Sequence, residues 1–257
     1  MTQPSPLRPS AARAIDPLPV RLVKRVILIL LGPLYFLIIA FMPLVLKRRS
    51  GFRTWYWNTI KRACSRLLWL LSIRAEMPQE ERDALAADTN SVIVINHCSH
   101  LDGFALMDVV PDAKEFTFAA KKSFFDALLT RTGFRSAELV EIDRASGSVA
   151  LGTLSKAVRE MDARRSVVLF PEGTRTKGES LGPFKAGAVL VARETGRTIR
   201  PIVIHDSNQL LPRGKTMPRS GTIRVQTLAP FHCDPEASAD SDVARLRAEM
   251  IAVFDNR

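Results

Sequence analysis

An uncharged apolar run near the N-terminus limits what this chain can fold into more than any other feature. The 21 residues of Val26–Leu46 carry no charge, and fifteen of them are Leu, Ile, Val or Phe. A helix of that length, at about 1.5 Å per residue, covers roughly the 30 Å hydrocarbon core of a bilayer. Each of those apolar side chains favours insertion by about 0.3 to 0.6 kcal/mol. The run therefore predicts a membrane-embedded helix rather than a core helix of a soluble domain.

The orientation of this segment is left open by the charges around it. Basic residues stand on both sides of the run: Arg21, Lys24 and Arg25 before it, and Lys47, Arg48, Arg49 and Arg53 after it. The positive-inside rule cannot orient a segment that is positive at both ends. Because Gly32-Pro33 and Pro43 weaken a helix, a re-entrant hairpin bent near Gly32-Pro33 is one solution, with both ends on the same anionic face. A spanning helix is the other.

The segments on either side of the run differ in character. Prolines recur within residues 1–20, and because each one fixes φ and removes a donor, this stretch predicts a disordered tail. After the run, apolar residues recur at helical spacing: Trp57, Ile60, Cys64, Leu67, Leu68 and Leu71. Basic and polar residues hold the opposite face, which predicts a basic amphipathic helix. That helix either lies on a bilayer or packs on the folded domain, and the pattern favours neither.

The net positive charge of the chain is confined to its first third. The net charge is +11, yet residues 1–75 hold 13 Lys and Arg against one acid, whereas residues 76–257 hold 24 bases against 25 acids. A nucleic-acid-binding domain would carry its basic residues on the folded part, so we expect no nucleic-acid partner. The basic segment instead suits an anionic membrane surface. Three unpatterned cysteines argue against a disulfide framework and for a reducing compartment.

The remaining residues, 76–257, have the pattern of an α/β domain. Apolar β-rich runs predict six strands: Val92–Ile95, Phe116–Phe118, Leu139–Ile142, Val167–Phe170, Ile199–Ile204 and Ile223–Leu228. Helical patterns alternate with these runs and end the chain. Strand–helix alternation predicts a mainly parallel sheet flanked by helices on both faces. The predicted organisation is thus a tail at 1–20, a membrane-embedded segment with an amphipathic helix at 21–75, and one domain at 76–257.

Two polar stretches follow predicted strands, where the active sites of parallel sheets gather. In the first, Asn96–Asp102, Ser99 and Asp102 fit the start of a helix. A turn before that helix would let the Asp102 carboxylate reach the His97 imidazole. Because such a carboxylate fixes the tautomer and raises the basicity of the other ring nitrogen, His97 is a candidate general base. A capping acid beside an ordinary histidine is the structural alternative.

The second polar stretch, Phe170–Arg175, follows the predicted strand Val167–Phe170. Gly173 lets backbone amides approach a ligand, Thr174 supplies a hydroxyl, and the planar fork of Arg175 suits a phosphate. A tight turn with an exposed Glu172–Arg175 pair is the structural alternative, and such a pair contributes little to stability.

Together these stretches resemble the PlsC-type lysophosphatidate acyltransferase family, part of the glycerolipid acyltransferase superfamily. The matching motifs occur in the order and spacing of that family: Asn96-His97-x-Ser99-x-x-Asp102, Ala120-Lys121-Lys122, Ile142-Asp143-Arg144, Phe170-Pro171-Glu172-Gly173-Thr174-Arg175, Phe184-Lys185-x-Gly187-Ala188 and Arg200-Pro201-Ile202-Val203. They cover nearly all of residues 76–220. So many ordered blocks make the resemblance specific.

The resemblance implies a role for each site residue. His97 would deprotonate a glycerol hydroxyl, with Asp102 orienting it. The implied substrate-binding residues are Lys121, Glu172, Gly173, Thr174 and Arg175. Of these, Lys121 and Arg175 would hold the acceptor phosphate, whereas Glu172 and Gly173 would shape the acceptor pocket. The donor would be acyl-CoA or acyl-carrier protein, with no further cofactor and no metal.

Cys98 and His100 occupy positions that the family leaves free, and they raise two other mechanisms. A Cys98 thiol nucleophile paired with His97 is disfavoured, because adjacent residues at an extended strand end point in opposite directions. A metal held by His97, His100 and Asp102 would lack an evident fourth protein ligand, although a catalytic zinc needs only three. We therefore expect Cys98 to be a packing residue and His100 a polar neighbour.

These observations predict a membrane-bound enzyme of the plasma or inner membrane, with its acyltransferase domain, residues 76–257, on the cytoplasmic face. We expect it to move an acyl group from acyl-CoA or acyl-carrier protein to the 2-hydroxyl of 1-acylglycerol 3-phosphate, giving phosphatidate. The alternatives are another lyso-lipid acceptor, such as lyso-ornithine lipid or lysophosphatidylglycerol, and a non-catalytic protein that binds anionic lipid. A metal-dependent hydrolase at His97, His100 and Asp102 is a third possibility.

Overall fold

A single mixed sheet forms the centre of the protein. The computed structural model describes residues 16–122, 126, 128–143, 147–177 and 180–256. Its strands are β1 (Ile73–Glu76), β2 (Ser91–Ile95), β3 (Glu115–Lys121), β4 (Val140–Ile142), β5 (Arg165–Leu169), β6 (Thr198–His205) and β7 (Gly221–Thr227). They lie in the order β1-β7-β6-β2-β5-β3-β4, and neighbours are parallel except β6 and β7. The predicted α/β class with a mainly parallel sheet is confirmed.

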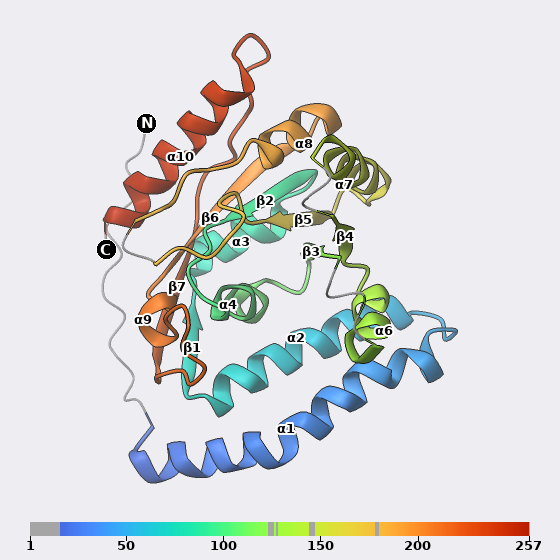
Figure 1. Cartoon of the computed structure of the whole chain (residues 1–257), viewed down its shortest axis with the longest axis vertical. Coiled ribbons are helices and arrows are strands. Elements are labelled where there is room, and N and C mark those ends of the chain that lie inside the picture. Colours follow the sequence, from blue (N-terminus) through green and yellow to red (C-terminus); the bar gives the residue numbers. More distant parts are fainter. Residues whose placement is uncertain (1–15, 123–125, 127, 144–146, 178–179, 257) are drawn as a thin grey trace.

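Helices cover both faces of this sheet (Figure 1). They are α1 (Leu18–Leu46), α2 (Phe52–Leu70), α3 (Gln79–Ala87), α4 (Leu101–Val109), α6 (Leu128–Ser136), α7 (Ser148–Glu160), α8 (Gly187–Thr195), α9 (Ser207–Leu210) and α10 (Ala239–Asp255). One core cluster packs α2 and α4 on the sheet, and a second packs α7, α8 and α10 on its other face. The sheet is therefore buried on both sides.

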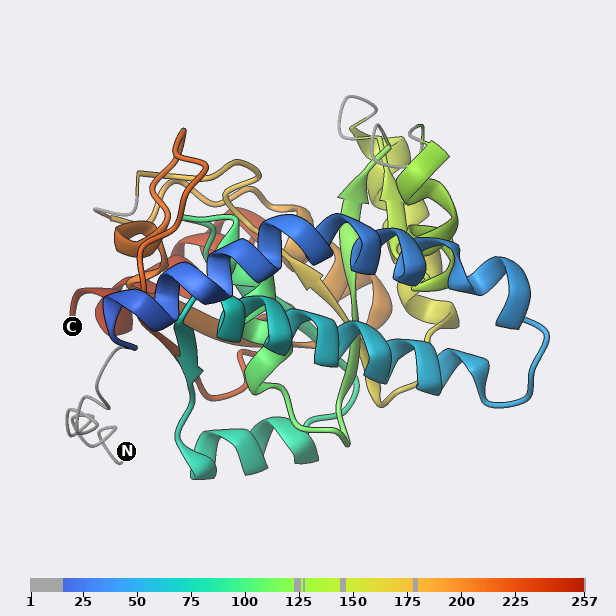
Figure 2. The same ribbon diagram turned by 90° about the horizontal axis from the view of Figure 1, so that it is seen from below.

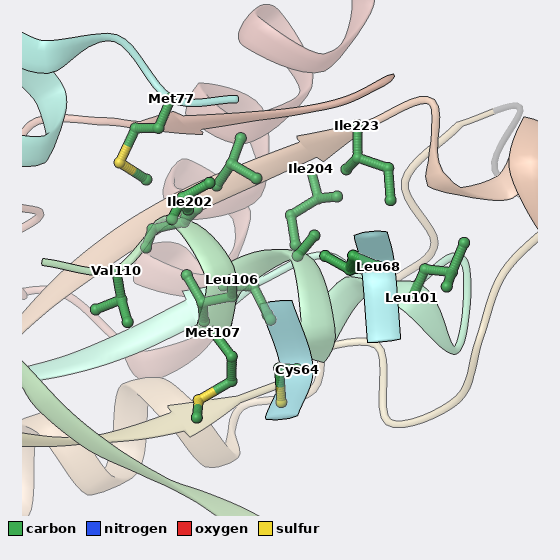
Figure 3. Packing of buried hydrophobic residues seen from close by; sticks show 14 of the residues in the cluster. Cys64, Leu68, Met77, Leu101, Leu106, Met107, Val110, Ile202, Ile204 and Ile223 are labelled. Atoms are coloured by element: carbon green, nitrogen blue, oxygen red, sulfur yellow. The ribbon is translucent and has the colours of Figure 1, made fainter. Parts of the chain in front are cut away.

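The alternation of side chains in β2 explains how one strand serves both cores. Val92 and Val94 belong to the cluster under α7, α8 and α10, whereas Ile93 and Ile95 belong to the cluster under α2 and α4. All four side chains are fully buried, as expected for a central strand of a parallel sheet. Figure 3 shows the cluster under α2 and α4, where Cys64 of α2 lies near Met107 of α4.

The six strands expected from the sequence are present, with ends that differ by a few residues. β1 is not predicted by the sequence pattern, because its four residues, Ile73–Glu76, contain no apolar run. This strand pairs in parallel with β7 at the edge of the sheet and lies across the predicted boundary between residues 75 and 76. The segment before residue 76 thus contributes to the sheet.

The long apolar run forms one continuous helix, α1. Of the two solutions left open, the hairpin bent near Gly32-Pro33 is not formed, because α1 continues through both Pro33 and Pro43. An interior proline kinks a helix without ending it when neighbouring elements hold both halves, and here α1 packs along α2 and α6. The helix begins at Leu18, inside the predicted tail, because Pro19 lies in the first turn, where a missing donor costs little. Residues 1–15 of that tail lie outside the described residues.

The predicted amphipathic helix corresponds to α2, and it packs on the folded domain rather than lying alone on a bilayer. Its inward face buries Cys64 and Leu68 against α4 and the sheet. Lys61, a basic residue of this helix, is also buried and donates to the Val110 carbonyl at 2.9 Å and to Asp112 at 2.5 Å. Figure 2 shows α1 lying alongside α2 across this side of the molecule.

Candidate active site

The loop between β2 and α4 brings His97 and Asp102 into contact. The His97 Nδ1 atom lies 2.8 Å from Asp102 Oδ2, and that oxygen also accepts the backbone N–H groups of Cys98 at 2.8 Å and Ser99 at 2.9 Å. Asp102 is completely buried, whereas the His97 side chain keeps 22% of its surface exposed. The expected turn before the helix is present, with α4 beginning at Leu101.

A second hydrogen-bond donor fixes the other side of the Asp102 carboxylate. Ser207, at the start of α9, donates its hydroxyl to Asp102 Oδ1 at 2.5 Å, and both side chains are buried. An ionised carboxylate can only accept, so the His97 Nδ1 atom carries the proton in its bond to Asp102. His97 Nε2 is then the ring nitrogen with a lone pair, as a general base requires.

Glu172 holds the backbone of His97 in place. One carboxylate oxygen accepts the His97 N–H at 2.7 Å, and the other accepts the Gly182 N–H at 2.9 Å. Burial raises the pKa of the Glu172 carboxyl, while these hydrogen bonds oppose that rise. The Thr176 N–H donates to the His97 carbonyl at 2.8 Å, so both backbone groups of His97 are occupied. Glu172 thus binds two loops together instead of forming the exposed pair with Arg175.

Gly173 takes a backbone conformation that favours glycine. Its φ is +69°, and a Cβ atom there would lie 2.9 Å from Lys185 Cε and 3.0 Å from Lys185 Nζ. The Lys185 side chain therefore lies against the loop that follows β5, and the backbone N–H of Lys185 donates to the Pro171 carbonyl at 2.8 Å. A side chain at position 173 would both strain the turn and displace a basic group.

The three remaining candidate residues have different surroundings. Arg175 is half-buried, and among the described residues its guanidinium makes no hydrogen bond or ion pair, while its carbonyl accepts from Arg213 at 3.1 Å. Burial lowers the pKa of His100, and the nearby Arg175 charge lowers it further. Thr174 is exposed. Lys121 is the last residue of β3, and its side chain lies outside the described part of the chain.

Cys98 is a buried packing residue, as expected. It belongs to the core cluster under α7, α8 and α10, and its Sγ atom lies 3.5 Å from Asn96 Nδ2 and 3.5 Å from Thr176 Oγ1. Burial raises the pKa of the Cys98 thiol to about 11. A thiol in that state is a poor nucleophile at neutral pH, because the thiolate is the reactive form. In the described residues, no group of three or more His, Cys, Asp or Glu could hold a metal ion.

A large apolar cavity opens beside His97. Its volume is about 750 Å³, and α1, α2, α4, β3 and α6 provide most of its lining. A chain of aromatic rings runs along it from the active site. The Phe170 ring lies 4.0 Å from the His97 ring, the Phe118 ring lies 6.4 Å beyond it, and Phe116 meets Phe118 and Trp57 edge-on. The cavity can hold a long apolar group with one end at His97.

Two residues that support the site are not predicted from the sequence. Ser207 and Thr176 lie 105 and 79 positions from their partners, and neither belongs to a motif block. Asn96 belongs to the first motif, and its amide bonds both backbone groups of Ile204, with the N–H at 2.7 Å and the carbonyl at 2.9 Å. This pair extends the contact between β2 and β6 beyond the sheet. Only the folded chain brings such partners together.

Comparison with known proteins identifies the family. A model of the family described as Acyltransferase matches residues 77–205, which is half of the chain and includes both polar loops. The chain belongs to the acyltransferase family. The PlsC-type resemblance seen in the motifs is confirmed by relatives of this acyltransferase and by a PlsC structure.

This acyltransferase is 31% identical over 148 residues to a chloroplastic 1-acyl-sn-glycerol-3-phosphate acyltransferase of Arabidopsis thaliana, covering 57% of this chain and 41% of that protein. It is 30% identical over 185 residues to a 1-acyl-sn-glycerol-3-phosphate acyltransferase of Helicobacter pylori, covering 68% and 73%. The chain thus spans less than half the length of the plant relative.

A solved structure shares the whole fold. It is the 1-acyl-sn-glycerophosphate acyltransferase PlsC from Thermotoga maritima, with a TM-score of 0.70 and 19% sequence identity. The match covers 93% of this acyltransferase and 94% of that protein, so it includes the N-terminal helices as well as the sheet. At this identity the likeness establishes the fold.

Proposed function

We propose that this acyltransferase moves a fatty acyl group from acyl-CoA or acyl-carrier protein to the 2-hydroxyl of 1-acylglycerol 3-phosphate, giving phosphatidate. The observation that carries the proposal is the His97–Asp102 pair at one end of an apolar cavity of about 750 Å³, with the charge of Arg175 near His100. The names of the relatives support the choice of acceptor.

The geometry supports direct transfer with His97 as general base. His97 Nε2 would take the proton of the glycerol hydroxyl while its oxygen attacks the thioester carbonyl and forms the new C–O bond. Collapse of the tetrahedral intermediate would break the C–S bond, and His97 would return the proton to the leaving thiolate. The buried Asp102 carboxylate would stabilise the imidazolium between these two steps. No covalent intermediate on the protein is needed, because the donor is already activated.

The two substrates would approach His97 from different sides. We infer that the acyl chain of the donor enters the apolar cavity, whose volume lies within the range of ligand pockets, roughly 300 to 1,000 Å³. Arg175 would hold the acceptor phosphate, because its planar guanidinium has no other anion among the described residues. Lys121 would assist from the end of β3, the strand beside β5. Glu172 would act as a positioning residue through the backbone of His97.

The N-terminal helix supports a place at the membrane surface. By length and composition α1 could cross a bilayer. Large apolar side chains are exposed along its whole length: Leu18, Val20, Leu22, Val23, Val26, Ile27, Ile29, Leu30, Leu31, Leu34, Phe36, Leu37, Ile38, Leu44 and Val45. Yet α1 packs lengthwise along α2 and α6 instead of projecting from the domain (Figure 2). We infer that it lies in the interface, with its outer face in one leaflet.

The charges around α1 support one side of the membrane. Basic residues flank α1 at both ends, and both clusters would meet the same anionic leaflet if the helix lies flat. The cytoplasmic leaflet carries that negative charge. We therefore propose that the acyltransferase domain works on the cytoplasmic face of the plasma or inner membrane, where both the lyso-lipid and a soluble donor can reach the site.

An acceptor panel tests the proposed reaction. The purified full-length protein in detergent would be given labelled acyl-CoA or acyl-carrier protein with 1-acylglycerol 3-phosphate, lysophosphatidylglycerol or lyso-ornithine lipid. We expect phosphatidate as the main product and none from a His97→Ala variant. Faster acylation of either other lyso-lipid would overturn the choice of acceptor. Binding of anionic vesicles without acylation of any acceptor would identify a non-catalytic lipid-binding protein instead.

A further inference from the structure

The loop between α9 and β7, residues 212–220, is an exposed basic surface that the proposed reaction does not use. Arg213, Lys215, Met217 and Arg219 are all exposed, and Met217 keeps 59% of its surface accessible. The sequence from 207 to 233 contains no Asp or Glu, although the domain as a whole is near charge neutrality. Among the described residues, Lys215 and Arg219 form no ion pair. The loop therefore concentrates positive charge beside one exposed apolar side chain.

Two arginines of α1 bind this loop directly. Arg21 Nη1 donates to the Ser220 hydroxyl at 3.0 Å, and Arg25 Nη2 donates to the Pro218 carbonyl at 2.7 Å. Figure 2 shows the orange loop beside the N-terminal half of α1. The same part of α1 exposes Leu22 and Val26, which are 55% and 53% accessible. If Leu22 and Val26 insert into a bilayer, residues 212–220 would therefore lie at its headgroup layer.

We propose that residues 212–220 form a second membrane-contacting surface that binds anionic phospholipid headgroups, with Met217 reaching the boundary of the acyl chains. The proposal rests on the interfacial place of α1 in the proposed function. Lys215 and Arg219 supply the charge that attracts an anionic leaflet. Met217, an apolar side chain between these two basic residues, is suited to the boundary between headgroups and acyl chains. An acidic carrier protein would match the charge of this loop. It would not explain the exposed Met217 or the contacts of the loop with α1.

This surface also reaches the active site. Arg213 donates to the Arg175 carbonyl at 3.1 Å, so one loop touches both the membrane helix and the residue assigned to the acceptor phosphate. A loop seated on headgroups would hold Arg175 near the level at which lyso-lipid phosphates lie. The acceptor could then be taken from the leaflet without leaving it.

A depth measurement tests the contact. Met217→Cys would carry an environment-sensitive fluorophore in a full-length Cys233→Ser background, because Cys64 and Cys98 are buried. Lys156→Cys is the matched control, since it is exposed on α7, on the side of the sheet away from α1 (Figure 1). In phosphatidylcholine vesicles containing phosphatidylglycerol, we expect lipid-borne quenchers to quench the label at 217 several-fold more than the label at 156. Equal quenching would overturn the proposal, as would a response at 217 to acyl-carrier protein but not to vesicles.

A charge reversal tests its consequence. Lys215→Glu combined with Arg219→Glu should lower the ratio of activity on anionic vesicles to activity in neutral detergent micelles several-fold. Lys156→Glu combined with Arg159→Glu makes the same charge change on exposed residues of α7, away from α1 (Figure 1), and should leave that ratio unchanged. An equal fall in both pairs would overturn the proposal. If the wild-type protein acylated no lyso-lipid, the proposed function would fail, and the quenching result would still decide the surface.

Discussion

At the scale of residues, the Asp102 carboxylate organises the site. It accepts from two backbone N–H groups, from the His97 ring and from the Ser207 hydroxyl. The contact with His97 could be predicted, because five positions separate the two residues and a turn before a helix closes that distance. The contact with Ser207 could not, because it depends on how β6 and α9 lie beside β2. Contacts between residues that are near in the sequence can thus be predicted, whereas contacts with distant residues such as Ser207 cannot.

Removing the proposed general base, His97, is the first test at this scale. His97→Ala should lower kcat by about 10² to 10⁴, the usual contribution of a general base. The folded protein should survive, because the His97 side chain is partly exposed and adds little packing. Steady-state kinetics with thermal unfolding of the same samples would measure both effects. Cys98→Ala is the control and should keep most activity, whereas a trapped acyl group on Cys98 would contradict direct transfer.

Ser207→Ala tests the buried donor to Asp102. A hydrogen bond to a charged group contributes about 1.5 to 3 kcal/mol, so losing it should leave Asp102 less firmly oriented. We expect kcat to fall about tenfold, since about 1.4 kcal/mol corresponds to a factor of ten, with little change in the KM of either substrate. Ser207→Thr keeps the hydroxyl and should recover part of the loss. A rise in KM without a change in kcat would show that Ser207 acts on binding instead.

Gly173→Ala tests the turn after β5. A non-glycine residue at a φ of +69° costs about 1 to 2 kcal/mol, and the added Cβ would press on Lys185. We expect a loss of activity together with a small fall in the unfolding temperature. Gly187→Ala is a matched control, because a Cβ at that position meets no atom within 4 Å. Similar losses in the two variants would argue against a special role for this turn.

At the scale of elements, burial on both faces made the central strands predictable. The Val and Ile runs of β2, β5 and β6 predict strands, because a central strand contributes apolar side chains to the cores on both faces of the sheet. The edge strand β1 carries no such run, and its four residues are held by pairing with β7. The continuation of α1 through Pro33 depends on its packing against α2 and α6, and the sequence pattern around Pro33 does not predict that packing. An element can therefore be predicted from the sequence when its own residues stabilise it, and cannot when distant elements hold it in place.

We expect the packing of α3 on β7 to depend on pH through Glu81. Burial raises the pKa of the Glu81 carboxyl to about 7, the Thr227 N–H opposes the rise, and the Glu80 charge adds to it. A raised pKa in the folded state contributes stability that is complete below the ordinary value near 4.5 and is lost as the pH rises through about 7. Glu81→Gln keeps the acceptor for Thr227 and removes the charge.

That variant should be more stable than the wild type by about 1 kcal/mol at alkaline pH and equal to it at acidic pH. Unfolding temperatures in detergent across this pH range would measure the difference. A difference that does not change with pH would mean that the Glu81 charge is not the cause.

At the scale of the whole molecule, the N-terminal segment is part of the fold as well as the proposed membrane anchor. Cys64, Leu68 and Ile73 belong to the core cluster that α4 completes, and α1 and α2 close the cavity beside His97. A chain cut at residue 75 would lose β1 and expose this core. The sequence pattern separates an apolar segment from a soluble domain because composition changes there, but composition does not report which parts pack together.

The topology of α1 is the last prediction. Both ends of α1 lie against one domain: Arg21 binds Ser220 at 3.0 Å and Arg25 binds Pro218 at 2.7 Å, while Ala40 in the C-terminal half lies against Gly133 of α6. A helix held in this way cannot place its two ends on opposite sides of a bilayer without leaving the domain. Cysteines introduced at Val20 and Ser50 should therefore both react from the cytoplasmic side in oriented vesicles.

Because the exposed apolar side chains of α1 favour insertion independently of salt, the protein should also remain in membranes through high salt and alkaline carbonate. Lys156→Cys on α7 provides the control that reports the side of the domain. Reaction of one α1 end only from outside would establish a spanning helix, and α1 would then have to separate from α2 and α6 in the membrane. Release by salt alone would instead mean that charge, rather than the apolar face of α1, holds the protein on the bilayer.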